Sequence, residues 1–224
     1  MKKKGFFCLS LMLLLFVSFS TKEIKVACVG NSITEGYGLA NQSKTAFPVI
    51  LDSILGTGFS VLNFGRSGAT AQKQGDVPYW TCNQFSNVFA LNPDIIILKL
   101  GTNDVRPRMD GKAGTNWNAG DFSRDYQALI DTFRIIPGKP QIYLCLPTPI
   151  SKTNAFNWND GDSSLRACVI PAIKKIAEIN KLPVIDLYTH MSSLPENFPD
   201  GIHPNENGAK IIAEFIAKAI KGKD

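Results

Sequence analysis

The sequence predicts an α/β fold in which a parallel sheet of five strands is covered by helices on both faces. Short apolar runs alternate with longer amphipathic segments along the 224 residues. Three of these runs are almost continuously apolar, as is typical of parallel strands that are buried on both faces. Strands that alternate regularly with helices indicate crossover connections between parallel neighbours, which is the pattern of an α/β sandwich.

The expected strands are rich in β-branched and other apolar residues, which pack well on a pleated sheet. Each run is short, and polar or glycine-containing turns follow most of them. In chain order the strands are IKVACV (24–29), FSVLNF (59–64), DIIILKL (94–100), QIYLCLP (141–147) and LPVIDL (182–187).

The expected helices fill the intervals between the strands and follow the last one. In the final segment, NENGAKIIAEFIAKAI, the apolar residues fall on one stripe at helical spacing, so that one face can pack against the sheet. The helices are expected near 44–55, 82–91, 121–136, 163–180 and 205–220.

The first residues, MKKKGFFCLSLMLLLFVSFS (1–20), have the order of a secretory signal peptide: lysines, then an apolar stretch, then small residues. An uncleaved membrane anchor is the alternative, since the apolar stretch is barely long enough to cross a bilayer. Cleavage just after Ser20 would leave residues 21–224, enough for one domain with a sizeable core. We therefore expect a single exported domain, periplasmic or extracellular, without stable membrane insertion.

The basic balance of the chain belongs largely to this first segment. The formal net charge is +5, and it falls to +2 without Lys2, Lys3 and Lys4. No run of Lys and Arg with interleaved aromatic residues follows, so nucleic acid is not an expected partner. The sequence gives no indication of the oligomeric state.

Four cysteines follow the signal segment: Cys28, Cys82, Cys145 and Cys168. Cys28 and Cys145 lie inside apolar strand runs, where cysteine commonly acts as a small hydrophobic residue. Export permits a disulfide between Cys82 and Cys168, but no feature of the sequence favours it, and we expect free thiols. None of the cysteines has the spacing of a zinc ligand, so no metal site is expected.

Four polar stretches follow expected strands. Ser32 comes directly after the first strand, and NFGRSGAT (63–70), GTND (101–104) and FPDGIHPNENG (198–208) follow the second, third and fifth. Ligands of open parallel sheets bind beyond the carboxyl ends of the strands, where these stretches would meet. Each stretch alone is an ordinary set of turn formers, and a serine in this place can also cap a helix or bind phosphate. Their common position favours a functional Ser32.

The residue types in these stretches fit acyl transfer through a serine. The reaction needs a base for the hydroxyl proton and a carboxylate that orients the base, and His203 follows Asp200 by three residues. It also needs donors facing the oxyanion of the tetrahedral intermediate. The backbone N–H groups of Ser32 and Gly68 and the side-chain amide of Asn103 would supply three. The sequence therefore predicts a serine hydrolase with Ser32 as nucleophile.

The second histidine of the chain, His190, follows the segment VIDLYT. No carboxylate lies at a useful spacing from it, and a lone histidine has many structural uses. We therefore interpret His190 as a loop or packing residue.

The four stretches resemble the ordered blocks of the SGNH hydrolases, also called the GDSL esterase/lipase family. The resemblance runs from VGNSIT near the start of the expected domain to DGIHPN near its end. It implies Ser32 as nucleophile, Gly68 and Asn103 as oxyanion donors with the Ser32 N–H, and Asp200 and His203 as acid and base. It also implies a flavodoxin-like three-layer sandwich with the strand order 2-1-3-4-5, and no cofactor.

One residue departs from the family pattern. The first block reads Gly-Asn-Ser-Ile, where the family has Asp before the serine and Leu after it. Asn31 can still support the turn, because Asn and Asp both form local hydrogen bonds and tolerate unusual backbone angles. We interpret the change as a subfamily trait rather than as the loss of the site.

The substrate is less clearly indicated. Trp80, Trp117 and Trp158 all fall in polar loops after strands, where an exposed ring can stack on a sugar. Each can equally well pin a long loop. GNSITEG and NFGRSGAT resemble, more loosely, the blocks of secreted bacterial carbohydrate acetylesterases, including sialate O-acetylesterase-like proteins. Arg106 and Arg108 could meet the carboxylate of an acidic sugar, although surface arginines usually have no such role.

The first expectation is thus a serine esterase that removes short acyl groups, acetyl above all, from a carbohydrate. A lysophospholipase or thioesterase of the same family and an inactive carbohydrate-binding protein are the alternatives. A nucleotide- or phosphate-binding module is disfavoured, because GNSITEG matches neither glycine-rich phosphate motif and such a module has no need of Asp200 and His203.

Overall fold

The computed structural model describes residues 22–107, 109 and 117–222, and the predicted signal peptide at 1–20 lies outside them. Five parallel strands form one sheet in the order β2-β1-β3-β4-β5, which confirms the predicted order 2-1-3-4-5. The strands are β1 (Ile24–Gly30), β2 (Phe59–Gly65), β3 (Ile95–Lys99), β4 (Gln141–Cys145) and β5 (Val184–Ile185).

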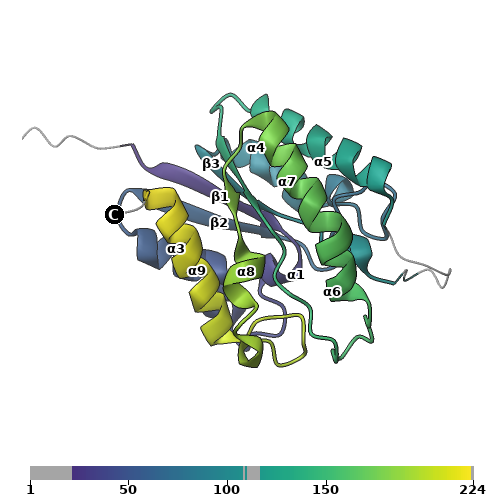
Figure 1. Cartoon of the computed structure of the whole chain (residues 1–224). Helices are drawn as coiled ribbons and strands as arrows, with labels where there is room; N and C mark the ends of the chain where they lie inside the picture. Colours follow the sequence, from purple (N-terminus) through teal and green to yellow (C-terminus); the bar gives the residue numbers. More distant parts are fainter. Residues whose placement is uncertain (1–21, 108, 110–116, 223–224) are drawn as a thin grey trace, which may run out of the picture.

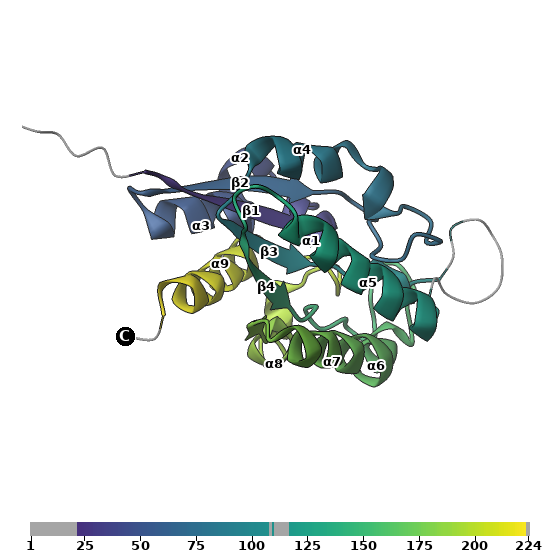
Figure 2. The ribbon, with the colours of Figure 1, turned by 90° about the horizontal axis from the view of Figure 1, so that it is seen from above.

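Helices cover both faces of this sheet (Figures 1 and 2). On one face, α3 and α9 pack with α8 against Ile95 and Ile97 of β3. On the other face, α4, α5 and α7 pack against Ile96 and Leu98 of the same strand. The alternating side chains of β3 therefore enter two separate cores, which explains why its sequence is continuously apolar. The helices in this description are α3 (Phe47–Leu55), α4 (Asn83–Leu91), α5 (Ala119–Arg134), α7 (Ile170–Asn180), α8 (Leu187–Met191) and α9 (Glu206–Lys221).

The carboxyl ends of the three neighbouring strands β1, β2 and β3 lie level with one another. Gly30, the last residue of β1, pairs with Gly65 on β2 and with Lys99 on β3. The chain therefore leaves all three strands at the same edge of the sheet. The polar stretches that follow them are brought together there, as the sequence predicts.

Prolines account for two helices that differ from their predicted bounds. The segment expected as one helix at 44–55 forms α2 (Gln42–Thr45) and α3, and Pro48 lies in the first turn of α3. A proline fits this turn because its missing N–H has no partner there. The segment 163–180 forms α6 (Gly161–Ser164), a π-helical turn and α7, with Pro171 in the first turn of α7. The missing donor of Pro171 interrupts the hydrogen-bond ladder at that point.

The last strand is much shorter than the predicted run at 182–187. β5 contains two residues at the edge of the sheet, directly after Pro183. Proline cannot donate to the ladder and is confined to edge strands and strand ends. Asp186 then ends the strand, because its side chain accepts the backbone N–H of Thr189 at 2.9 Å and so caps α8.

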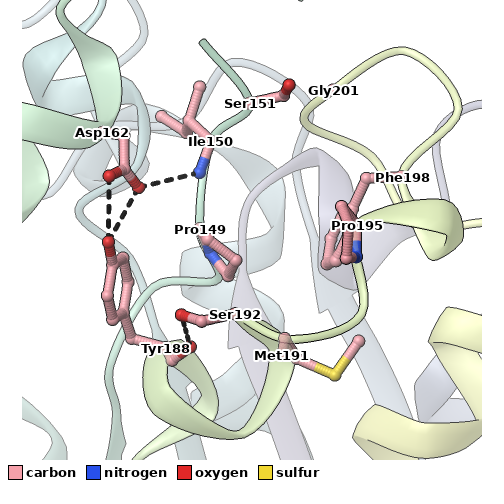
Figure 3. Close-up of a pocket in the computed structure, with 10 residues that line it drawn as sticks. All are labelled: Pro149, Ile150, Ser151, Asp162, Tyr188, Met191, Ser192, Pro195, Phe198 and Gly201. Carbon is pink, nitrogen blue, oxygen red and sulfur yellow. Dashed lines mark hydrogen bonds between the residues drawn. The ribbon is translucent and has the colours of Figure 1, made fainter.

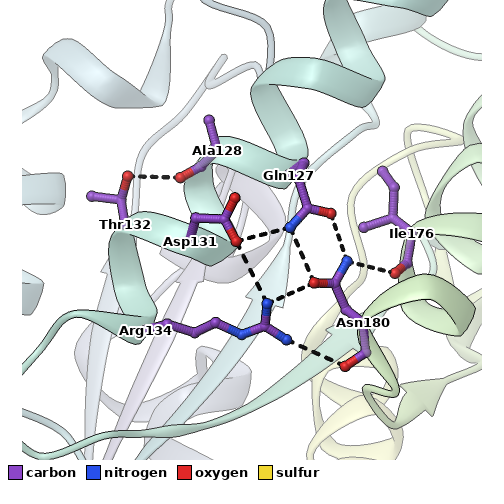
Figure 4. A network of polar contacts seen from close by, with 7 residues as sticks. All are labelled: Gln127, Ala128, Asp131, Thr132, Arg134, Ile176 and Asn180. Atoms are coloured by element: carbon purple, nitrogen blue, oxygen red, sulfur yellow. Dashed lines mark hydrogen bonds and ion pairs between the residues drawn. The ribbon is translucent and has the colours of Figure 1, made fainter.

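A polar network joins α5 to α7 on the surface of the molecule (Figure 4). The Gln127 side chain donates to Asn180 Oδ1 at 3.0 Å, and Arg134 Nη1 donates to the same oxygen at 2.6 Å. This network fixes the C-terminal end of α7 to the neighbouring helix, and α7 in turn supports β4. Within the described ranges, no helix is both long enough and apolar enough to span a membrane.

Candidate active site

Ser32 is the first residue of a short helix, α1 (Ser32–Glu35), that starts directly after β1. The Asn31 side chain accepts the Ile33 N–H at 3.1 Å and caps this helix. Asparagine thus supports the turn, as expected where the family has aspartate. Ser32 is 8 % exposed, and the helix start fixes its side chain at the carboxyl edge of the sheet.

Ser32, His203 and Asp200 form a hydrogen-bonded chain. Ser32 Oγ lies 2.9 Å from His203 Nε2, and His203 Nδ1 lies 2.7 Å from Asp200 Oδ2. With the ring proton on Nδ1, His203 donates to the carboxylate and Nε2 accepts the hydroxyl proton of the serine. This is the geometry that proton removal from a serine nucleophile requires.

Hydrogen bonds within the turn Asp200–His203, and from the loop after β4, fix the acid and the base. The other oxygen of Asp200, Oδ1, accepts the backbone N–H groups of Ile202 at 2.8 Å and His203 at 2.7 Å. Two backbone bonds attach the loop after β4: the Ser151 N–H donates to Gly201 O at 2.7 Å and the Ala155 N–H to Asp200 O at 2.9 Å. The carboxylate therefore has a fixed orientation toward the His203 ring.

Gly68 and Asn103, which the sequence predicts as oxyanion donors, line one pocket together with Ser32. Gly68 has a φ of +79°, a left-handed conformation that favours glycine. Asn103 begins the 3₁₀ turn Asn103–Val105, and its Nδ2 donates to Ala69 O at 3.0 Å, which orients the amide beside the Gly68 turn. The buried Asp104 accepts the N–H groups of Ala71 and Gln72 at 3.1 and 3.0 Å and so ties the two segments together.

We expect Asn103→Ala to lower kcat by roughly 10²–10³ while KM changes little, because an oxyanion donor binds the transition state more strongly than the ground-state carbonyl. Steady-state kinetics with an acetate ester, together with the melting temperature of the variant, measure this effect. A variant changed only in KM would make Asn103 a substrate-binding residue without an oxyanion role.

A pocket of about 330 Å³ is bordered by Ser32, His203 and the two residues Gly68 and Asn103. Its aromatic walls adjoin the base: the Tyr37 ring centroid lies 4.6 Å from that of His203, and Phe156 meets the same ring edge-on at 5.5 Å. The pocket is lined by Ser32, Tyr37, Ser67, Gly68, Asn103, Arg106, Pro107, Met109, Phe156, Trp158 and His203.

A second hollow, of about 230 Å³, borders the turn Asp200–His203 at Gly201 (Figure 3). Asp162 lies on one wall, where it accepts the Tyr188 hydroxyl at 2.9 Å and the Ile150 N–H at 3.2 Å. None of Ser32, His203 and Asp200 lines this hollow. Its polar groups support the loop after β4.

Burial, hydrogen bonds and neighbouring charges together set the pKa values of His203 and Asp200. Burial lowers the pKa of His203, the Asp200 carboxylate partly offsets this, and the Lys99 ammonium lowers the pKa further. Burial alone would raise the pKa of Asp200, but the hydrogen bonds from the His203 backbone, the His203 ring and the Ile202 N–H hold it below its ordinary value. His203 is therefore neutral, and ready to accept a proton, to lower pH than an ordinary histidine.

Lys99 is a buried cation in the wall behind this site. It is 1 % exposed, and within the described residues its Nζ has no hydrogen-bond partner. Burial lowers its pKa to about 8, so it remains mostly charged at neutral pH. Its Cα pairs with Gly30, two residues before Ser32.

The acidic limb of kcat/KM is expected to have its midpoint below about 6.5, the ordinary histidine pKa, and Lys99→Met is expected to move it to higher pH. Removal of the cation raises the pKa of His203, so the base becomes protonated and inactive earlier as pH falls. The pH–rate profiles of wild type and variant measure this shift. Lys25→Met, at the opposite end of β1, is the matched control. An unchanged limb in Lys99→Met would contradict the electrostatic account.

The structure separates the tryptophans and arginines that the sequence offered as substrate contacts. Trp158 and Arg106 line the pocket, whereas Trp80 does not: its Nε1 donates to Ala71 O at 3.1 Å and its ring packs on the core. Trp117 also packs on the core, against the Phe122 ring. Arg108 lies outside the described residues. For Trp80 and Trp117 the loop-pinning interpretation fits better than substrate contact.

Tyr37 and Phe156 are pocket residues that the sequence analysis did not single out. Tyr37 follows the Ser32 block by a few residues, and Phe156 lies two residues before Trp158 in NAFNWNDGD. Their closeness in the sequence to Ser32 and to Trp158 was the one feature that could have indicated these two aromatic residues as pocket residues. His190, in contrast, stacks on Phe215 at a centroid distance of 3.9 Å and does not line the pocket, as the packing interpretation requires.

The described part of the chain holds no group of three or more His, Cys, Asp and Glu side chains placed to bind a metal ion. Cys28, Cys82, Cys145 and Cys168 are unpaired, and Cys28 and Cys145 are buried in the sheet.

Comparison with known proteins agrees with this geometry. The profile of the GDSL-like Lipase/Acylhydrolase family matches residues 28–211. An acetylxylan esterase of Xylanibacter ruminicola is 37 % identical over an alignment of 217 positions that covers 88 % of this chain but only 43 % of that protein. The chain thus spans less than half the length of this relative.

Solved structures share the fold at lower identity. The acetyl xylan esterase AlAXEase superposes with a TM-score of 0.69 at 23 % identity, covering 88 % of this chain and all of that one. A carbohydrate acetylesterase from Sinorhizobium meliloti superposes with a TM-score of 0.67 at 17 % identity, covering 89 % and 99 %. At these identities the similarity establishes the architecture.

Proposed function

The chain belongs to the GDSL-like lipase and acylhydrolase family, and we propose that it hydrolyses short acyl esters, acetyl esters above all, carried on a carbohydrate. The observation that carries this proposal is the chain of hydrogen bonds from Ser32 through His203 to Asp200 at the wall of the pocket. The match of the family profile to residues 28–211 confirms, at the level of the family, the resemblance seen in the sequence blocks.

Each proton transfer and each charge in the proposed reaction is assigned to a named group at the pocket. Ser32 Oγ attacks the ester carbonyl while His203 Nε2 takes its proton, and the oxyanion is held by the N–H groups of Ser32 and Gly68 and by Asn103. The imidazolium, stabilised by Asp200, then protonates the leaving alcohol, and an acetyl-serine remains. Water attacks this ester with His203 again as base, which releases acetate and restores the hydroxyl of Ser32.

The form of the pocket supports a short acyl group on a sugar. Ser32 and His203 lie at the wall of a pocket of about 330 Å³, and Phe156 and Trp158 lie beside them with their ring centroids 6.0 Å apart. Phe156 is 39 % exposed, and we propose that its ring stacks on a sugar. The acetylxylan esterase relative, whose name states such a substrate, points the same way.

Arg106 is proposed to contact the substrate as a hydrogen-bond donor rather than as a receptor for a carboxylate. Its guanidinium forms an ion pair with Asp76 at 3.1 Å, and both side chains are more than 90 % buried. The charge of the arginine is already balanced by this partner. This favours neutral sugars over the acidic sugars that the sequence had left open.

Acetylated xylo-oligosaccharides are expected to be turned over with a higher kcat/KM than lysophospholipids or long-chain thioesters, because Phe156 and Trp158 offer stacking surface and the pocket volume suits a short acyl group. Parallel assays of released acetate and of released fatty acid measure the preference. Faster turnover of the long-chain substrates would favour a lysophospholipase or thioesterase. Binding of xylo-oligosaccharides without any release of acetate would favour an inactive carbohydrate-binding protein.

We also propose that residues 1–20 direct export and that residues 21–224 act as one domain, because the first segment has the order of a secretory signal peptide. N-terminal sequencing of the protein recovered outside the cytoplasm tests the cleavage near Ser20. An N-terminus at Met1 would support the membrane-anchor alternative.

A further inference from the structure

The carboxylate of Glu35 binds the turn that carries the proposed oxyanion donor. Its Oε2 accepts the backbone N–H of Ser67 at 2.8 Å and also the Ser67 hydroxyl. Ser67 directly precedes Gly68. Glu35 is the last residue of α1, whose first residue is Ser32. The same short helix thus begins at the proposed nucleophile and ends at a side chain that accepts hydrogen bonds from Ser67, next to Gly68.

The backbone of α1 also lies directly against this turn. A Cβ at Gly65 would be 2.1 Å from the Glu35 N, so only glycine allows the approach. Asn63 bridges the two segments: its Nδ2 donates to Thr34 O at 2.8 Å and its Oδ1 accepts the Gly65 N–H at 2.9 Å. The segment between β2 and Gly68 is therefore built onto α1.

From these contacts we propose that Glu35 is a positioning residue that fixes the Gly68 N–H relative to Ser32 Oγ. Glu35 does not line the pocket and cannot contact the ester, so it acts through Ser67 and Gly68. Hydrogen bonds to a carboxylate are roughly twice as strong as neutral ones. The inference rests on the proposed esterase activity, since it assigns the origin of an oxyanion donor.

The carboxylate also decides where the Ser67 N–H points. Because this N–H is bound to Glu35, it does not compete with Gly68 for the developing oxyanion or for water in the pocket. Without the carboxylate, Ser67 loses both bonds to α1, and the Gly68 turn is held to it through Asn63 and the close contact at Gly65 alone. A displacement of about 1 Å in a catalytic group is enough to lower the rate by roughly 10².

The test compares Glu35→Ala with the conservative variant Glu35→Gln. Glu35→Ala is expected to lower kcat for an acetate ester by roughly 10–100-fold with KM within about twofold of wild type. Glu35→Gln keeps an oxygen that can accept both Ser67 donors and should recover most of this loss. Glu206→Gln, at the start of α9, removes a carboxylate from a different hollow that His203 also borders; it is the matched control and should retain wild-type kcat.

Active-site titration with diethyl p-nitrophenyl phosphate separates positioning from folding, because the fraction of protein that is finally phosphorylated reports the folded fraction. The rate of that phosphorylation should fall in Glu35→Ala in parallel with kcat, since it needs the same oxyanion donors. Wild-type kcat in Glu35→Ala, or a loss that only matches the lost folded fraction, would overturn the inference. Inactivity of the wild-type protein toward every ester would instead refute the proposed function.

Discussion

Ser32→Ala is expected to lower the rate of ester hydrolysis by about 10⁴–10⁶ while the protein remains folded. The serine oxygen is the atom that forms the bond to the acyl group, and it lies 2.9 Å from His203 Nε2, whereas the Ser67 hydroxyl in the same pocket is bound to Glu35. Chromogenic acetate-ester hydrolysis, with and without a chelator, measures the loss and its independence of metal ions.

The matched control is Ser43→Ala, on an exposed part of α2, where the hydroxyl bonds only to a neighbouring asparagine. This variant should keep wild-type activity. Wild-type turnover in Ser32→Ala would remove the central assignment, whatever the substrate proves to be.

His203→Ala is expected to leave almost no activity, whereas Asp200→Ala should retain measurably more. His203 transfers the proton in both halves of the reaction, while Asp200 orients the ring and stabilises the imidazolium. In the comparable triad of another serine hydrolase, loss of the carboxylate costs roughly a hundredfold less than loss of the histidine. The pH profiles of wild type, Asp200→Ala and His203→Ala measure the two roles.

His190→Ala is the control for this pair, because His190 stacks on α9 away from the pocket and its loss should affect stability more than kcat. If His203→Ala retained the acidic limb of the wild-type profile, another group would be the base, and His190 would be the first alternative to examine.

The strand order and the position of the site follow from local features of the sequence. Apolar runs as continuous as Ile95–Leu98 are typical of strands buried on both faces, and polar residues directly after parallel strands meet at one edge of the sheet. The ends of elements were less predictable. Pro48, Pro171 and Pro183 each changed a boundary, because a missing N–H acts on hydrogen bonds that a hydrophobic pattern does not report.

The reacting groups were identifiable because they lie within short motifs, but the walls of the pocket were not. Phe156 reaches His203 only because the loop after β4 is bonded to the Asp200–Gly201 turn, a contact between segments far apart in the chain. Trp80 lies in a loop after a strand, as Trp158 does, but its Nε1 donates to Ala71 O and it does not line the pocket. A place in such a loop does not distinguish these two outcomes, since tertiary packing decides them.

The role of Glu35 was hidden for a related reason. In the sequence it is one more residue of GNSITEG, and its partner Ser67 belongs to a different block. Only the level ends of β1 and β2 place the two side by side.

The most direct test of the assignment is to trap the covalent intermediate. Wild-type protein mixed rapidly with an activated acetate ester and quenched in acid should show, by peptide mass spectrometry, the mass of one acetyl group on the peptide that contains Ser32. The acetyl group should be absent from Ser32→Ala. In His203→Ala that has been acetylated chemically at Ser32, the acetyl group should persist longer than in the wild-type protein, because deacylation needs the base. An acetyl group found on another residue would contradict a mechanism through Ser32. So would a burst of released alcohol during which no acetylated peptide is detected.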